Sequence, residues 1–175
     1  FTNTGDITGL LDFATGDNLI NLTGGTMTGT IKANGGANTL TASAGSVHTG
    51  EIVLAGSKAQ TVTVKEASVV GNMTLGDGAN QVAVDSATAA NITTGDGNSA
   101  LTFSGAAVAD AITLGTGNNT LTLSDSAHIA SLVAGVGGNN AVLVKDSATF
   151  GTLDAGTGGA NDSLTFDGAD YTLAN

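Results

Sequence analysis

Few side chains in this sequence have the chemistry to hold a metal ion. The most suggestive are carboxylates in glycine-rich turns, namely Asp77, Asp96 and Asp162. A calcium ion takes six or more oxygen ligands, with several carboxylates among them, and the equivalent turn at residues 115–119 contains no acid. We therefore predict no metal site and no cofactor, and we keep calcium as an alternative ligand.

Threonine hydroxyl groups offer a second chemistry, because they recur at a regular spacing. Thr-X-Thr triplets occur at residues 39–41, 61–63 and 120–122. The series is broken where Gln81, Ala83 and Leu143 take equivalent positions, and threonine is also a common exposed residue of strands. The candidate exposed binding ladder consists of Thr39, Thr41, Thr61, Thr63, Thr102, Thr120, Thr122 and Thr165.

The elements that must position these side chains belong to a repeat of about 20 residues. Glycine opens the same short phrase at intervals of 19 to 21 residues. After each glycine turn, apolar and polar residues alternate, as in the segment 119–123, which is the pattern of a strand with one buried face. A second apolar segment follows a corner of small residues. The opening glycines are Gly16, Gly35, Gly56, Gly76, Gly95, Gly115, Gly135 and Gly156.

Stacking of these repeats predicts an all-β protein. We expect a right-handed, single-stranded parallel β-helix (β-solenoid) with about eight coils of roughly 20 residues, formed by residues 1–175 as one domain. Right-handedness follows from the general preference of parallel crossover connections. A thin core fits the composition, because only 3% of the residues are aromatic and none is proline.

Aligned repeats predict which residues form the columns of the core. In the first strand the columns start with Ile20 and Leu22, and each recurs once per coil. A polar ladder precedes them, and its stacked amides are expected to stabilise the turns: Asn18, Asn38, Gln60, Asn80, Ser99, Asn119, Asn140 and Asp162. The second segment is predicted to bury Met27, Val47, Val69, Ala89, Val108, Ile129, Phe150 and Tyr171, followed by a column that runs from Ile31 to Leu173.

Catalytic residues are not predicted. His48 and His128 are 80 residues apart, which corresponds to four coils and about 19 Å along the axis. Each is expected on a solvated face, beside Val47 or Ile129. The acids Asp85, Asp125 and Asp146 fall at corners and are expected to form turns. We predict that the protein is not an enzyme. A polysaccharide-degrading activity is kept as a distant third hypothesis, after the two non-catalytic functions given below.

Charge restricts the partners. Four lysines, no arginine and fifteen acids give a net charge of −11, and nucleic acids and anionic membranes both require a basic surface. No apolar run approaches the roughly 18 residues of a membrane span, so we expect no direct membrane insertion of this segment. The chain begins at Phe1 rather than at Met, and we expect it to be a fragment of a longer protein.

Two phrases, at residues 95–104 and 115–124, together with the cysteine-free background rich in Gly, Thr, Asn and Ala, resemble the passenger region of bacterial type V autotransporters. The resemblance implies a secreted β-helix exposed at the outer surface of a Gram-negative cell, acting as a stalk or adhesin in attachment and virulence. The implied partners are host or bacterial cell-surface molecules, or a second copy through self-association. The alternative is a ligand-binding solenoid for glycan, calcium or ice, without catalytic activity.

Overall fold

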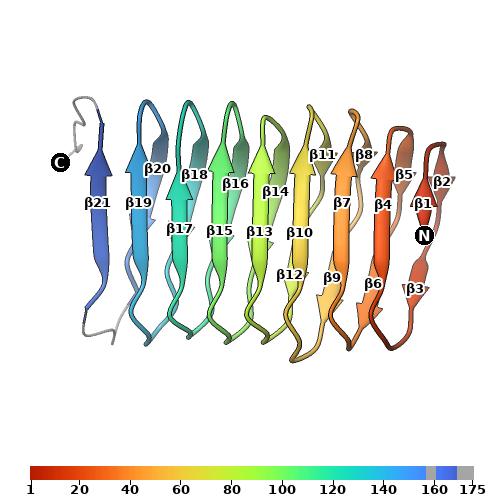
Figure 1. Ribbon diagram of the computed structural model, residues 1–175, viewed down its shortest axis with the longest axis horizontal. Coiled ribbons are helices and arrows are strands. Elements are labelled where there is room, and N and C mark those ends of the chain that lie inside the picture. The colour runs from red at the N-terminus through yellow and green to blue at the C-terminus, as the bar shows by residue number, and fades with distance from the viewer. Residues whose placement is uncertain (157–160, 169–175) are drawn as a thin grey trace.

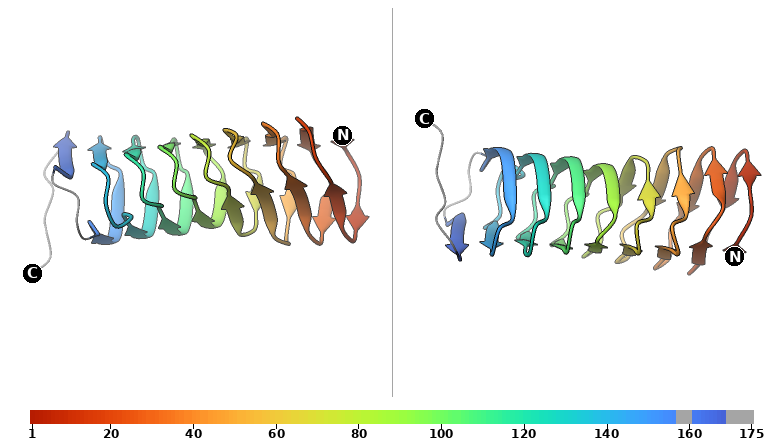
Figure 2. Two further views of the ribbon diagram at one scale, coloured as in Figure 1. Left: turned by 90° about the horizontal axis from the view of Figure 1, so that it is seen from below. Right: turned by 90° about the horizontal axis from the view of Figure 1, so that it is seen from above.

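The protein is a parallel β-solenoid, described by a computed structural model over residues 1–156 and 161–168. Successive repeats stack as about eight coils along one axis (Figures 1 and 2), and every strand pairing in the described residues is parallel and joins neighbouring coils. In Figure 1 the front strands point up, the rear strands point down, and the chain advances from right to left. That geometry makes the solenoid right-handed. The described residues contain no helix.

Two sheets enclose the core. The nine-stranded sheet, which we call sheet A, contains one strand from each coil. Its members are β1 (Thr2–Asn3), β4 (Leu19–Thr23), β7 (Thr39–Ser43), β10 (Thr61–Lys65), β13 (Gln81–Asp85), β15 (Ala100–Ser104), β17 (Thr120–Leu123), β19 (Ala141–Lys145) and β21 (Ser163–Asp167).

The opposite sheet, which we call sheet B, is interrupted in its first coils, where each coil supplies two short strands. The interrupted coils contain β2 (Ile7–Thr8) with β3 (Leu11–Phe13), β5 (Thr26–Thr28) with β6 (Ile31–Asn34), β8 (Val47–His48) with β9 (Ile52–Ala55), and β11 (Val69–Val70) with β12 (Met73–Leu75). The later coils each contain one strand: β14 (Thr88–Thr93), β16 (Val108–Thr113), β18 (His128–Val133) and β20 (Thr149–Asp154).

The two predicted core columns of the first strand are confirmed. Ile20 pairs with Leu40 and Leu22 pairs with Ala42, and the same register continues through the sheet. These side chains are buried, except that in the last described strand Leu164 is 39% exposed and Phe166 is half-buried. The column that starts at Ile31 is also confirmed as far as Leu153. Tyr171 and Leu173 lie outside the described residues.

The first core column of sheet B differs from the prediction in three coils. Val47, Val69 and Val108 point outward, and the residue after each of them fills the core. The corner from sheet A to sheet B is one residue longer in these coils than in the coil of Met27. Because side chains alternate along a strand, a shift of one residue exchanges the inner and outer faces. The buried residues at these positions are His48, Val70 and Ala109.

His48 is therefore buried, and its prediction as a solvated residue was wrong. Its side chain is 1% exposed and lies in the column between Met27 and Val70. The Nε2 atom lies 2.9 Å from the carbonyl oxygen of Gly29, in the gap between β5 and β6. Nδ1 has no hydrogen-bond partner within the described part of the chain. Desolvation lowers the pKa of His48 from its ordinary value of 6.5, and the hydrogen bond to Gly29 opposes that effect.

The predicted polar ladder is present and stabilises both the stack and the turns. The amide of Asn18 donates to Asn38 Oδ1 at 2.7 Å, and that of Asn38 donates to Gln60 Oε1 at 2.8 Å. Further along, the Asn119 amide donates to Asn140 Oδ1 and to the carbonyl oxygens of the turn at residues 115–117. Buried polar groups need such partners to avoid a desolvation cost. The ladder therefore stabilises the turns that lead into the sheet A strands from β4 onward.

Carboxylates at the opposite corner join coils in a similar way. Asp125 Oδ2 accepts the backbone N–H of Gly105 at 2.8 Å, and Asp146 Oδ2 accepts that of Asp125 at 3.1 Å. Asp125 and Asp146 have φ values of 59° and 55°, in the left-handed region that Asp tolerates better than most residues. The predicted role as turn formers is confirmed for Asp125 and Asp146, whereas Asp85 is the last residue of strand β13.

Candidate interaction surface

The candidate threonine ladder lies on the outward face of sheet A. Thr39, Thr61 and Thr120 occupy the first outward column, and the other five threonines occupy the second column, two residues further along each strand. The neighbours in these columns are small or polar, except for Leu19 and Leu143. The eight side chains are exposed or half-buried. The face is therefore a flat array of short side chains along the solenoid.

The array is hollowed where alanine replaces threonine. A shallow depression of about 210 Å³ lies over β10, β13 and β15. Ala83 and Ala100 form its floor, because their side chains are shorter than the threonines of the adjacent strands. Its polar rim consists of Thr61, Thr63, Gln81 and Thr102. This break in the ladder, visible in the sequence as irregularity, is a shape feature of the surface.

Sheet A is electrically neutral on its outward face although the chain has a net charge of −11. The first two outward columns contain no charged residue in the described strands. The third column, at the carboxyl end of the strands, contains two lysines and two aspartates, so its charges sum to zero: Lys65, Asp85, Lys145 and Asp167. Sequence reasoning missed this column, because only the strand register shows that these charges share one face.

The acids outside sheet A mostly serve the turns. Asp77 Oδ1 accepts the backbone N–H of Asp96 at 3.1 Å, and Asp17 Oδ1 accepts that of Ala37 at 2.7 Å. Such bonds use the carboxylates within the stack. Within residues 1–156 and 161–168, no three His, Cys, Asp or Glu side chains are grouped so that they could hold a metal ion.

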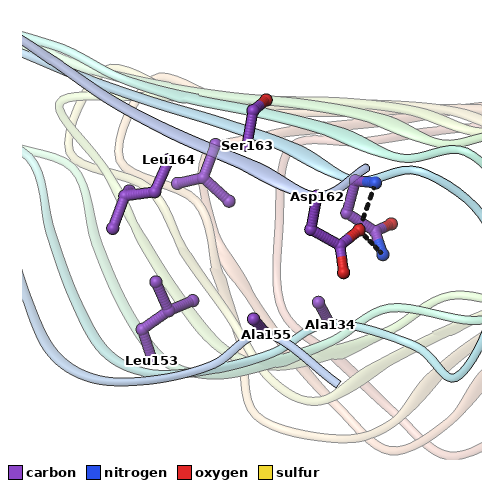
Figure 3. Close-up of a pocket in the computed structure, with 8 residues that line it drawn as sticks. Ala134, Leu153, Ala155, Asp162, Ser163 and Leu164 are labelled. Carbon is purple, nitrogen blue, oxygen red and sulfur yellow. Dashed lines mark hydrogen bonds between the residues drawn. The ribbon is translucent and has the colours of Figure 1, made fainter. Parts of the chain in front are cut away.

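A second cavity, of about 160 Å³, lies between β19, β20 and β21 (Figure 3). Its lining is mostly apolar and includes Leu153, Ala155 and Leu164. The polar group at its edge is the carboxylate of Asp162, whose Oδ1 accepts from the backbone N–H of Asn140 at 2.7 Å and from its side-chain amide at 3.2 Å. Because that carboxylate oxygen already belongs to the polar ladder, the described residues around the cavity offer no set of converging ligand groups.

The histidines do not meet. His128 lies half-buried on the outer side of sheet B, beside Ile129, as predicted, and its Nδ1 lies 2.8 Å from Thr149 Oγ1. His48 lies in the core, four coils away. Neither histidine has a carboxylate among its recorded hydrogen-bond partners in the described residues.

Comparison with protein-family models, with curated proteins and with solved structures finds no match. Within the described residues, no helix is long and apolar enough to span a membrane. The fold thus defines a parallel β-solenoid with one neutral, flat face.

Proposed function

We propose that this chain is a β-helical stalk or adhesin segment of a secreted bacterial protein, displayed at the cell surface, and that the outward face of sheet A makes the attachment. The observation that carries the proposal is the neutral face in a chain of net charge −11. The flat array of Thr, Ser and Ala side chains can approach another surface without opposing its charge, whereas the acidic turns repel negatively charged cell surfaces.

The rod shape also supports a stalk. Each coil packs only against its neighbours, so added coils extend the reach of the protein without a new core. The partners under this proposal are host or bacterial cell-surface molecules, including other copies of the chain. Catalysis has no part in the proposal.

Beads coated with the purified chain provide a test. We expect the beads to capture bacterial or host cells, or to cluster with one another, and we expect Thr102→Arg to weaken this attachment by placing a bulky charge on sheet A. The matched control is Thr113→Arg, which introduces the same charge at an exposed position of sheet B in the same coil. Beads that neither capture cells nor cluster, or equal effects of the two variants, would contradict the proposal.

The second candidate is a ligand-binding solenoid for glycan, calcium or ice. The observation that favours it is the repeat of hydroxyl groups at the strand spacing, about 4.8 Å. Glycan-array binding, a rise in melting temperature with calcium or thermal hysteresis in ice, lost in Thr102→Arg and kept in Thr113→Arg, would favour this candidate over attachment to cells.

A further inference from the structure

The charged residues in the third outward column of sheet A follow a particular order. Because of this order, the column is complementary in charge to a second copy of itself that runs in the opposite direction. From β10 to β21 the column reads Lys65, Asp85, Ser104, Ser124, Lys145 and Asp167. Ser124 follows β17 in the same register, because Phe103 pairs with Leu123. Read in the opposite direction, each lysine is replaced by an aspartate, each aspartate by a lysine, and the serines stay in place.

We infer that sheet A binds a second copy of this chain face to face, with the two rods antiparallel and a two-fold axis between β15 and β17. This arrangement places β10 over β21 of the second copy, β13 over β19, and β15 over β17. Lys65 then faces Asp167 and Asp85 faces Lys145, and two-fold symmetry repeats both pairs. The inference rests on the proposed function, in which sheet A is the attachment face, and it names the partner.

The inner columns fit the same arrangement. The side chain of Leu143, on β19, lies over the hollow at Ala83, on β13. In the first column Gln81 meets Ala141, and Ala100 meets Thr120. At these positions a larger residue opposes a smaller one. The first two columns bring no charge into the contact, where an unpaired charge would be costly.

The size of the contact predicts a weak pair. Six strands at about 4.8 Å, four or five residues long at about 3.3 Å per residue, cover about 30 Å by 16 Å, or about 1,000 Å² for both copies together. That area lies near the lower limit of specific interfaces. A displayed protein present in many copies makes such pairs effective through multivalency, which suits attachment between surfaces.

The charged residues of the third column also lie close to opposite charges within their own chain. Lys65 is next to Asp85 in the strand register, and its Nζ lies 3.1 Å from Glu66 Oε1. Charge-swap variants separate this intrachain role from pairing between copies. One variant carries Lys65→Asp with Asp85→Lys, and another carries Lys145→Asp with Asp167→Lys. Each keeps one lysine beside one aspartate in its own chain, but each places like charges opposite one another in the antiparallel pair.

Sedimentation equilibrium at about 0.15 M salt, where the Debye length is about 8 Å, measures the pairing. We expect the native sequence to dimerise with a Kd on the order of 100 µM. Each of the two variants defined above exchanges one lysine–aspartate pair and is called a single-swap variant. We expect each of them to bind itself at least about tenfold more weakly, because four attractive pairs become repulsive. The variant with both swaps restores complementarity and is expected to dimerise as the native sequence does. An equimolar mixture of the two single-swap variants is expected to form a heterodimer.

Three outcomes would overturn the inference: a native sequence that stays monomeric at about 1 mM, single-swap variants that dimerise normally, or a double-swap variant that fails to recover. Because the double-swap chain contains every substitution of the two single-swap chains, its recovery excludes misfolding as the cause of their weakness. The bead assay separates the proposals, since beads that capture foreign cells while the chain stays monomeric leave the attachment function intact and remove only this partner.

Discussion

Sheet A and sheet B are formed by the same repeats but differ in how they accommodate changes in coil length. In sheet A the two core residues are always two positions apart, as in Ile20 and Leu22 or Leu121 and Leu123. In sheet B the corresponding core residues are four positions apart in the coil of Met27 and Ile31, but three apart in that of Ala89 and Ile92. Length changes are thus confined to sheet B, the corners and the turns, and sheet A keeps an unbroken lattice.

The difference has a local cause in sheet B. Glycines stack where its first strands are interrupted, and Gly50 packs against the backbone of Gly29 so closely that a Cβ atom would overlap the Gly29 carbonyl group. This close packing accommodates three residues between Met27 and Ile31, one more than the two between Ala89 and Ile92. Sheet A therefore keeps a regular outer surface because the changes in coil length are accommodated in sheet B.

The largest expected effect follows from breaking the regular sheet. Replacing Leu121 by Asp, at a side chain that is 1% exposed, should lower the free energy of unfolding by about 4 kcal/mol or more, because it buries an unpaired charge. Denaturant unfolding followed by circular dichroism measures this change. Thr120→Asp, at the exposed neighbouring position of β17, is the control and should change stability by less than about 1 kcal/mol.

Breaking the glycine stack should destabilise sheet B somewhat less. Gly50→Ala forces the backbones of two coils apart, and we expect a loss of about 3 kcal/mol. Gly5→Ala is the matched control, since a Cβ atom there would meet no atom within 4 Å. Equal melting temperatures for the two variants would show that the interruption of sheet B does not depend on close backbone packing.

The ladder that precedes sheet A can be tested with two adjacent asparagines. Asn140 is 3% exposed and accepts from the backbone N–H and the amide of Asn119, whereas Asn139 is exposed. We expect Asn140→Ala to cost about 2 kcal/mol, because it leaves buried donors without partners, and Asn139→Ala to be close to neutral. The measurement is the midpoint of chemical unfolding, and similar losses in both variants would contradict a special role of the ladder.

The smallest expected effect concerns pH and sheet B. Burial lowers the pKa of His48 in the folded state, so below about pH 6.5 the unfolded chain takes up a proton that the native His48 resists. Stability should therefore fall as pH drops from about 7.5 to 5.5, by about 1 kcal/mol.

The contribution of His48 is isolated by His48→Met, which copies Met27 from the adjacent coil. This variant should lose that part of the pH dependence. His128→Thr, copying Thr149, should keep it. If the native chain and His48→Met respond to pH identically, His48 does not titrate differently on folding.

Much of the fold was predictable because the pattern is repeated. An alternation that is ambiguous in one strand becomes decisive when about eight copies agree, and the columns of Ile20 and Ile31 were assigned correctly on that basis. The prediction failed at Val47, Val69 and Val108, where a corner with one extra residue exchanges the inner and outer faces. At Val69 and Val70 the hydrophobic pattern is acceptable in either register, whereas at Val47 the register imposed by the neighbouring coils places His48 in the core instead of the valine.

The sequence by itself determined the period, the parallel stacking, the regular core of sheet A and the polar ladder, because each depends on residue types that recur at the same place in every coil. Only the tertiary structure decided that His48 is buried, that sheet A is neutral, and that Lys65, Asp85, Lys145 and Asp167 form one column. The reason is physical. A charge or a histidine that occurs once carries no periodic signal, and its face is set by the register that the neighbouring coils impose.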